Sequence, residues 1–229
     1  ANATLQSDQA SAFLGFSVEG AGDVNGDGYA DVIVGAFLYD SGELDEGAAF
    51  VFHGGASGIG SGNPGTANAT LQSNQAGASL GSSVAGAGDV NGDGFADVIV
   101  GARSYTAGQS GEGAAFLFHG GSTGVTSGSP STANATLQPD QASANMGQSA
   151  AGAGDVNGDG LADVIVGADL YDAGQDGEGA AFVYLGGAEG VRSGNPASAH
   201  STLQADQASA QLGFTVAGAG DVNGDGYSD

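Results

Sequence analysis

The sequence predicts an all-β protein that is assembled from β-propeller blades of four antiparallel strands each. Three observations lead to this fold class. The segment around Asp23 recurs around Asp89, Asp155 and Asp221, with 66 residues between successive copies, and a fixed period of this kind indicates a repeat architecture. Each copy contains short apolar, β-branched segments and shows no helical periodicity. Glycine supplies 46 of the 229 residues, which indicates many tight turns.

One copy of the repeat contains four strand segments in chain order. Residues 67–72 (ANATLQ) alternate apolar and polar side chains, as an edge strand does. Residues 80–89 (LGSSVAGAGD) lead into an Asp-rich loop, and their small side chains suit the crowded innermost position of a blade. Residues 97–102 (DVIVGA) are continuously apolar, as expected for a strand covered on both faces. Residues 113–121 (GAAFLFHGG) form the next strand, and residues 122–134 are turn material.

These strands divide the chain into blades without a linker between them. A single array of about 3.5 blades, a partial propeller, is expected over residues 1–229, because four-stranded units stacked radially leave only short sheet edges. A parallel β-helix is the alternative, but its rungs are much shorter than this period. The expected parts are the outer strand of a preceding blade at 1–12, whole blades at 13–78, 79–144 and 145–210, and the start of a further blade at 211–229.

The charge composition excludes several classes of partner. Two basic residues, Arg103 and Arg192, stand against 26 acidic residues, so the formal net charge is −24. A surface of this charge repels phosphate backbones, and we expect no nucleic-acid partner. Anionic membrane surfaces are also disfavoured unless divalent cations bridge the two. No apolar run is long enough to span a membrane, so we expect no membrane insertion.

Other bulk features bear on the folded state and on processing. The absence of cysteine removes both disulfides and thiol chemistry. The 40% hydrophobic content is arranged in periodic runs, which argues for a folded chain despite the high charge. The sequence begins at Ala1 without a Met or a signal peptide, so we expect a processed or excised segment.

The Asp-rich loop presents oxygen atoms at a spacing that suits calcium. Counted from Asp23, carboxylate or amide oxygens fall at positions 1, 3, 5 and 9, which are Asp23, Asn25, Asp27 and Asp31. Gly28 at position 6 allows a sharp turn, and position 7 can offer its backbone carbonyl. Calcium takes about six to eight oxygen ligands in flexible geometry, whereas magnesium demands a strict octahedron. Carboxylates this close would repel one another without a cation, so we expect one Ca²⁺ in each of the four loops.

The residues after the loop exclude helical calcium-binding modules. An EF-hand loop closes with a bidentate Glu at position 12, but that position holds Val34, Val100 or Val166 here. An apolar strand follows the loop, so neither an EF-hand nor a dockerin fits. An Asp-rich turn without a metal is the alternative, and its recurrence in four matching copies makes us favour calcium.

Four segments resemble the FG-GAP repeat of integrin alpha-chain propellers and related bacterial secreted proteins: FSVEGAGDVNGDGYADVIVGA (16–36), LGSSVAGAGDVNGDGFADVIVGA, MGQSAAGAGDVNGDGLADVIVGA and LGFTVAGAGDVNGDGYSD. The resemblance covers essentially the whole chain. It implies a seven-bladed propeller with calcium in the loops between the first and second strands, acting outside the cell in adhesion or ligand recognition. Carried over by position, with position 7 contributing its carbonyl, the implied ligands are Asp23, Asn25, Asp27, Tyr29, Asp31, Asp89, Asn91, Asp93, Phe95, Asp97, Asp155, Asn157, Asp159, Leu161, Asp163, Asp221, Asn223, Asp225, Tyr227 and Asp229.

The chain departs from the implied ring in its length. Seven blades of this period would need about twice as many residues. The sequence also stops at Asp229, before the apolar strand that should follow the fourth loop. We therefore expect a fragment of a longer repeat protein or a piece of an assembly. Further repeats of the same chain, or neighbouring copies, would complete the open blades.

Other recurring residues have architectural explanations. His53 and His119 share a position that Leu185 fills in the third copy, which indicates a strand end rather than a catalytic residue. Ser122 lies in a formal G-x-S-x-G match, but between two strands and without triad partners. A tyrosine and a glutamate recur in each copy. We expect the tyrosine to cap a blade and the glutamate to accept backbone hydrogen bonds; a ligand surface lined by both is the alternative. These residues are Tyr39, Tyr105, Tyr171, Glu46, Glu112 and Glu178.

Together these patterns predict a non-enzymatic, calcium-binding repeat module of a secreted or cell-surface protein. It would act in adhesion or protein interaction, with Ca²⁺ as the structural staple that pins each inner strand to its neighbour. Two alternatives stay open, a carbohydrate-binding propeller and a subunit of an extracellular fibre. The repeats are so alike that no surface patch points to a particular protein or glycan ligand.

Overall fold

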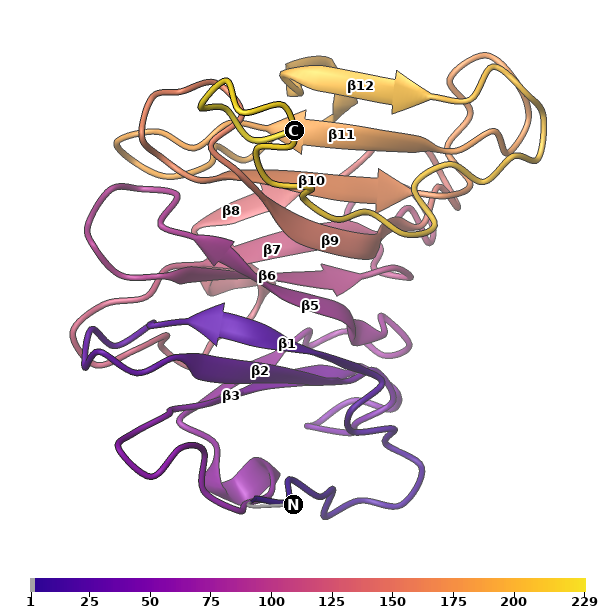
Figure 1. Ribbon diagram of the computed structural model, residues 1–229. Coiled ribbons are helices and arrows are strands. Elements are labelled where there is room, and N and C mark those ends of the chain that lie inside the picture. Colours follow the sequence, from indigo (N-terminus) through magenta and orange to yellow (C-terminus); the bar gives the residue numbers. More distant parts are fainter. Residues whose placement is uncertain (1–2) are drawn as a thin grey trace.

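Three antiparallel sheets of four strands each stack in chain order in a computed structural model that describes residues 3–229 (Figure 1). Ala1 and Asn2, part of the expected strand at 1–12, lie outside the described residues. Within residues 3–229 the only helical elements are three short 3-10 turns, and none is long and apolar enough to cross a membrane. The prediction of an all-β, partial propeller is confirmed.

Each sheet keeps its strands in sequence order and joins them by hairpin connections. The first sheet contains β1 (Ser17–Gly22), β2 (Asp31–Ala36), β3 (Ala48–Phe52) and β4 (Ala69–Gln72). The second contains β5 (Leu80–Gly88), β6 (Asp97–Ala102), β7 (Ala114–Phe118) and β8 (Ala135–Leu137). The third contains β9 (Met146–Gly154), β10 (Asp163–Ala168), β11 (Ala180–Tyr184) and β12 (Ser201–Gln204). The 3-10 turns are η1 (Pro64–Thr66), η2 (Pro130–Thr132) and η3 (Pro196–Ser198).

The segments outside the three sheets lie against them. Leu5 forms an isolated parallel bridge with Gly62 of the first repeat. At the other end, the backbone N–H of Leu212 donates to the carbonyl of Glu178 at 3.0 Å. Val216 N donates to Ser149 Oγ at 3.1 Å. Residues 205–229 therefore run along the third sheet and contain no assigned strand of their own.

The core lies between the sheets, because each sheet buries both faces of its two central strands. One apolar cluster joins Ile33, Val51 and Leu71 of the first sheet to Phe116 and Phe118 of the second. An equivalent cluster joins the second sheet to the third. All six residues of β6 are buried, as the unbroken apolar run predicted.

The recurring glutamates accept backbone hydrogen bonds, as predicted. Glu112 is buried, and its Oε1 accepts N–H groups from Ala107, Gly108 and Gln109 at 2.9, 2.6 and 3.0 Å. This carboxylate closes the connection between β6 and β7. The recurring tyrosine packs beside it: Tyr105 meets the ring of Phe116 edge to face, with centroids 5.2 Å apart.

The first strands of neighbouring sheets approach closely because their residues are small. A β-carbon at Gly86 of β5 would lie only 2.7 Å from the carbonyl oxygen of Gly20 in β1. Val84 N donates across the same gap to Ser17 Oγ at 3.0 Å. The same link joins β9 to β5, through Ala150 N and Ser83 Oγ at 3.0 Å. Small side chains in these strands are therefore a condition for stacking.

We predict that Gly101→Ala loosens the contact between the second and third sheets. A β-carbon at Gly101 would overlap the carbonyl oxygen of Gly147, a backbone atom that cannot rotate away. The expected loss of unfolding free energy is about 1–3 kcal/mol, the range for overpacked sites, measured by urea denaturation. Gly121→Ala is the matched control, because nothing lies within 4 Å of the added carbon. Equal stability of the two variants would contradict the steric account.

Candidate metal centre

Three of the Asp-rich loops join the first and second strands of a sheet, the fourth (221–229) follows the third sheet, and successive loops are bonded to one another. Ala96 N, in the second loop, donates to the carbonyl oxygen of Asp23 in the first at 3.0 Å. Ala162 N donates to Asp89 O at 3.0 Å, and Ser228 N donates to Asp155 O at 2.8 Å. The four loops therefore form a continuous row along one edge of the stacked sheets.

The carboxylate at position 1 organises each loop. Asp23 Oδ1 accepts N–H groups from Gly26 and Asp27 at 2.7 and 3.1 Å, and its Oδ2 accepts Gly28 N at 2.8 Å. The other three loops repeat these bonds. The hydrogen bond from Gly160 N to Asp155, followed by smaller contributions from its neighbours, lowers the pKa of that carboxyl. Gly226 N lowers the pKa of Asp221 in the same way.

The side chains at positions 3 and 5 fold back onto the loop in successive Asx turns. Asn25 Oδ1 accepts Asp27 N at 3.0 Å, and Asp27 Oδ1 accepts Tyr29 N at 3.0 Å. The two side chains also meet, because Asn25 Nδ2 donates to Asp27 Oδ2 at 3.1 Å. The structure thus brings the predicted ligands at positions 1, 3 and 5 onto one exposed turn.

The carboxylate at position 9 has a different setting. Asp163 is fully buried; its Oδ2 accepts Val156 N and its Oδ1 accepts Gly186 N, both at 2.8 Å. It therefore ties the start of the loop to the end of β11. Burial raises the pKa of Asp163 and outweighs the opposing effect of the two N–H donors. Burial likewise raises the pKa of the equivalent Asp97.

Position 7 has a role that sequence reasoning missed. The Phe95 ring of the second loop covers Gly26 of the first so closely that a β-carbon there would lie 2.6 Å from it. Leu161 covers Gly92 and Tyr227 covers Gly158 in the same way. From the sequence, we expected this residue to contribute only its backbone carbonyl as a ligand. Every copy has a bulky side chain at this position, and this pattern could have indicated that the side chain packs against a neighbouring loop.

The donor set of the loops fits a hard cation such as calcium. All of the predicted donors are oxygen atoms, and each carboxylate oxygen can accept more than the one or two N–H bonds that it makes here. Within residues 3–229, no three His, Cys, Asp or Glu side chains gather into a metal-holding group by themselves. A cation in these loops would therefore also need the amide oxygen at position 3 and the carbonyl at position 7.

The remaining candidate residues lie at packing or turn positions. The Nε2 atoms of His53 and His119 are buried and have no hydrogen-bond partner within residues 3–229. A β-carbon at Gly124 of the second sheet would overlap the His53 ring, so this histidine fills a contact between sheets. Ser122 is exposed in the turn after β7. These positions support the architectural explanation.

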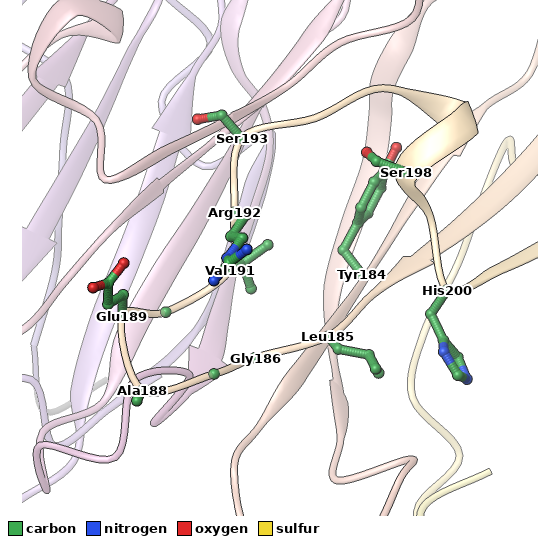
Figure 2. Close-up of a pocket in the computed structure, with 12 residues that line it drawn as sticks. Tyr184, Leu185, Gly186, Ala188, Glu189, Val191, Arg192, Ser193, Ser198 and His200 are labelled. Carbon is green, nitrogen blue, oxygen red and sulfur yellow. The ribbon is translucent and has the colours of Figure 1, made fainter.

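A pocket of about 720 Å³ lies inside the turn between β11 and β12 (Figure 2). Leu185, His200 and Arg192 line it, and the buried Tyr184 hydroxyl has no partner among the described residues. Burial raises the pKa of that hydroxyl. Leu185 occupies the position of His53, which the following sheet covers in the first repeat. This pocket therefore lies on the face where a following sheet packs elsewhere in the array.

Comparisons with known proteins place similar repeats in integrin alpha chains. The family model described as "FG-GAP repeat" matches residues 15–52, 80–118 and 146–184. Integrin alpha-IIb of Mus musculus is 34% identical over 169 residues, which is 72% of this chain and 16% of the relative. Integrin alpha-5 of Xenopus laevis is 32% identical over 70% of this chain and 15% of its own. Integrin alpha-PS5 of Drosophila melanogaster is 35% identical with the same coverage. The chain thus spans less than a fifth of the length of these relatives.

We predict that Asp163→Asn destabilises the chain even when chelator is present. The amide keeps one acceptor and turns an N–H group toward the other backbone donor, so a buried bond to a charged group is lost. The expected cost is about 2–3 kcal/mol, measured by urea denaturation. Asp176→Asn makes the same charge change at an exposed side chain, and we expect it to stay within about 0.5 kcal/mol of the parent. Similar losses in both variants would mean that charge, rather than the two backbone bonds, is responsible.

Proposed function

The chain belongs to the FG-GAP repeat family, and we propose that it is a non-enzymatic interaction module of an extracellular adhesion protein, with Ca²⁺ in its Asp-rich loops as a structural staple. The observation that carries this proposal is the bonded row of loops. Ala162 N donates to Asp89 O, and Leu161 covers Gly92. An ion that fixes one loop therefore also fixes the surface on which the next repeat rests.

In the second loop the ion would be held by Asp89, Asn91 and Asp93, by the carbonyl of Phe95 and by Asp97. Bound calcium would supply positive charge, which neutralises carboxylates that otherwise accept only N–H groups from the backbone and from the Asn91 side chain. Four ions would offset eight of the 24 net negative charges. Asp97 already accepts Val90 N and Gly120 N at 2.9 Å, so an ion there would also brace the end of β7.

Several observations support an extracellular interaction role. The relatives reported above are integrin alpha chains. Extracellular calcium modules have dissociation constants of about 10⁻⁴–10⁻³ M, so calcium outside cells would fill such loops and cytosolic calcium would not. The non-enzymatic assignment is supported by the settings of His53 and Ser122, which fit packing and turn positions.

The partners that we propose are a protein ligand and further repeats. The pocket around Leu185 and Tyr184 supports the second partner, because the equivalent surface at His53 is covered by the following sheet. A glycan ligand and a fibre built from end-to-end blades are the alternatives. The first strand of each sheet carries mainly small side chains, which favour neither a glycan-binding site nor a contact between blades of a fibre.

We predict that calcium stabilises the chain and that each loop binds one ion. Ligand that binds only the folded state adds about 2.7 kcal/mol at a concentration of 100 times its dissociation constant. The melting temperature should therefore rise in calcium, fall in chelator and respond less to magnesium. Asp93→Ala should remove one site from the stoichiometry measured by titration calorimetry, and Asp176→Ala should remove none. A melting temperature that does not change with calcium would refute the structural role of the ion.

We predict calcium-dependent capture of an extracellular protein by the immobilised chain. Binding to a panel of purified matrix and cell-surface proteins, measured by surface plasmon resonance, should be lost in chelator and weakened by Asp93→Ala. A glycan array and electron microscopy test the two alternatives on the same sample. Binding to glycans alone, or calcium-dependent filaments without binding to any protein, would overturn the adhesion assignment.

A further inference from the structure

We propose that the four Asn–Gly pairs of the Asp-rich loops are deamidation sites, at which the asparagine closes to a succinimide and reopens as aspartate or isoaspartate. The reaction needs no cation, although the same asparagines are the position-3 donors of the proposed calcium sites. Asparagine is a thermolabile residue, and in this chain it precedes glycine only in the loops. These sites are Asn25, Asn91, Asn157 and Asn223. Every other asparagine precedes Ala, Gln, Met or Pro.

The structure explains why the loop keeps this reactive pair. Gly26 has φ +72°, and a β-carbon there would lie 2.6 Å from the Phe95 ring. Gly92 has φ +76°, with Leu161 at 2.9 Å from the same position. A side chain at this position would be strained by the backbone and blocked by the next repeat. The stacking of the repeats therefore requires the residue that leaves the preceding asparagine open to attack.

The attacking nitrogen makes the same hydrogen bond in every loop. Gly26 N donates to Asp23 Oδ1 at 2.7 Å, and the equivalent bond in the other three loops is 2.6–2.7 Å long. Hydroxide from water takes the proton from this nitrogen once the hydrogen bond to the carboxylate opens. Gly26 is exposed, so water reaches the site.

The reaction balances with water as the only co-reactant. Gly26 N bonds to Asn25 Cγ, the Cγ–Nδ2 bond breaks, and the amide nitrogen leaves as ammonia with the proton that Gly26 N loses. Water then adds to one of the two carbonyls of the five-membered ring. Opening at one carbonyl gives aspartate, and opening at the other gives isoaspartate, in which the backbone runs through the side-chain carbon.

The loop also contains the restraint on this reaction. Asn25 Oδ1 accepts Asp27 N at 3.0 Å, and Asn25 Nδ2 donates to Asp27 Oδ2 at 3.1 Å. The second bond must break before ammonia leaves, because it holds the leaving nitrogen. Each event then adds one negative charge to a loop that has three carboxylates. An isoaspartate also lengthens the backbone by one carbon, so Asp27 N can no longer keep its place on Asp23 Oδ1.

The test is a time course of the 229-residue chain in chelator at mildly alkaline pH and physiological temperature, followed by peptide mapping with mass spectrometry. We expect the four loop peptides to lose their amides first and to yield aspartate and isoaspartate together. Asn68 and Asn134, each followed by alanine, are the internal controls. Amide loss at either control as fast as in the loops would overturn the proposal.

Gly224→Ala provides the matched variant. Gly224 has φ +78°, so alanine strains the fourth loop, but a β-carbon there meets nothing within 4 Å, unlike those at Gly26, Gly92 and Gly158. The rest of the array should therefore fold as in the parent. We expect amide loss at Asn223 to slow while Asn25, Asn91 and Asn157 react at their parental rates. Circular dichroism of the variant and the parent tests whether the fold is intact. An unchanged rate at Asn223 would show that the glycine does not control the reaction and would also overturn the proposal.

Discussion

Carboxylates that accept backbone N–H groups hold the turns of every blade. A hydrogen bond to a charged group contributes about 1.5–3 kcal/mol, whereas a buried carboxylate without partners is strongly unfavourable. Glu112 takes three N–H groups from one connection, and Asp163 takes one from each of two connections. A chain with almost no basic residues thereby binds most oxygens of its buried acids with main-chain donors; among residues 3–229, Asp169 Oδ1 and Glu178 Oε2 are buried without a hydrogen-bond partner. The tight glycine turns make this possible, because they point successive N–H groups at one side chain.

The second requirement is close approach between sheets. Glycines and alanines in β1, β5 and β9 let neighbouring backbones pass within reach of serine bridges such as Ser83 Oγ to Ala150 N. The apolar contribution comes from larger side chains farther out, where Phe116 and Phe182 pack against the preceding sheet. Neighbouring sheets therefore touch through their backbones near the first strands and through side chains near the outer strands. The sheets spread apart from the first strands outward, as in a fan.

Sequence reasoning anticipated the features that depend on local pattern. The apolar run at 97–102 coincides with β6, and the expected edge strand at 67–72 contains β4. The recurring glutamates also accept backbone hydrogen bonds, as expected. The role of Asp163 was out of reach, because its second donor, Gly186 N, is 23 residues away and no local spacing reveals such a partner. Packing of Phe95 on the previous loop was missed for the same reason, since it acts between repeats. Calcium stays a prediction from donor chemistry and family.

The two faces of each blade are unlike, and this asymmetry has a consequence for how such a protein changes in size. One face carries phenylalanine rings and the other carries smaller aliphatic side chains, as in the contact of Phe116 with Val51 and Leu71. Units can then be joined in only one direction, with the ring face of each unit meeting the aliphatic face of the one before. Gene duplication or loss in whole multiples of the period preserves every junction, while an insertion within a strand disturbs the contacts of that unit with its neighbours. Copy number can therefore drift in evolution without new interface chemistry.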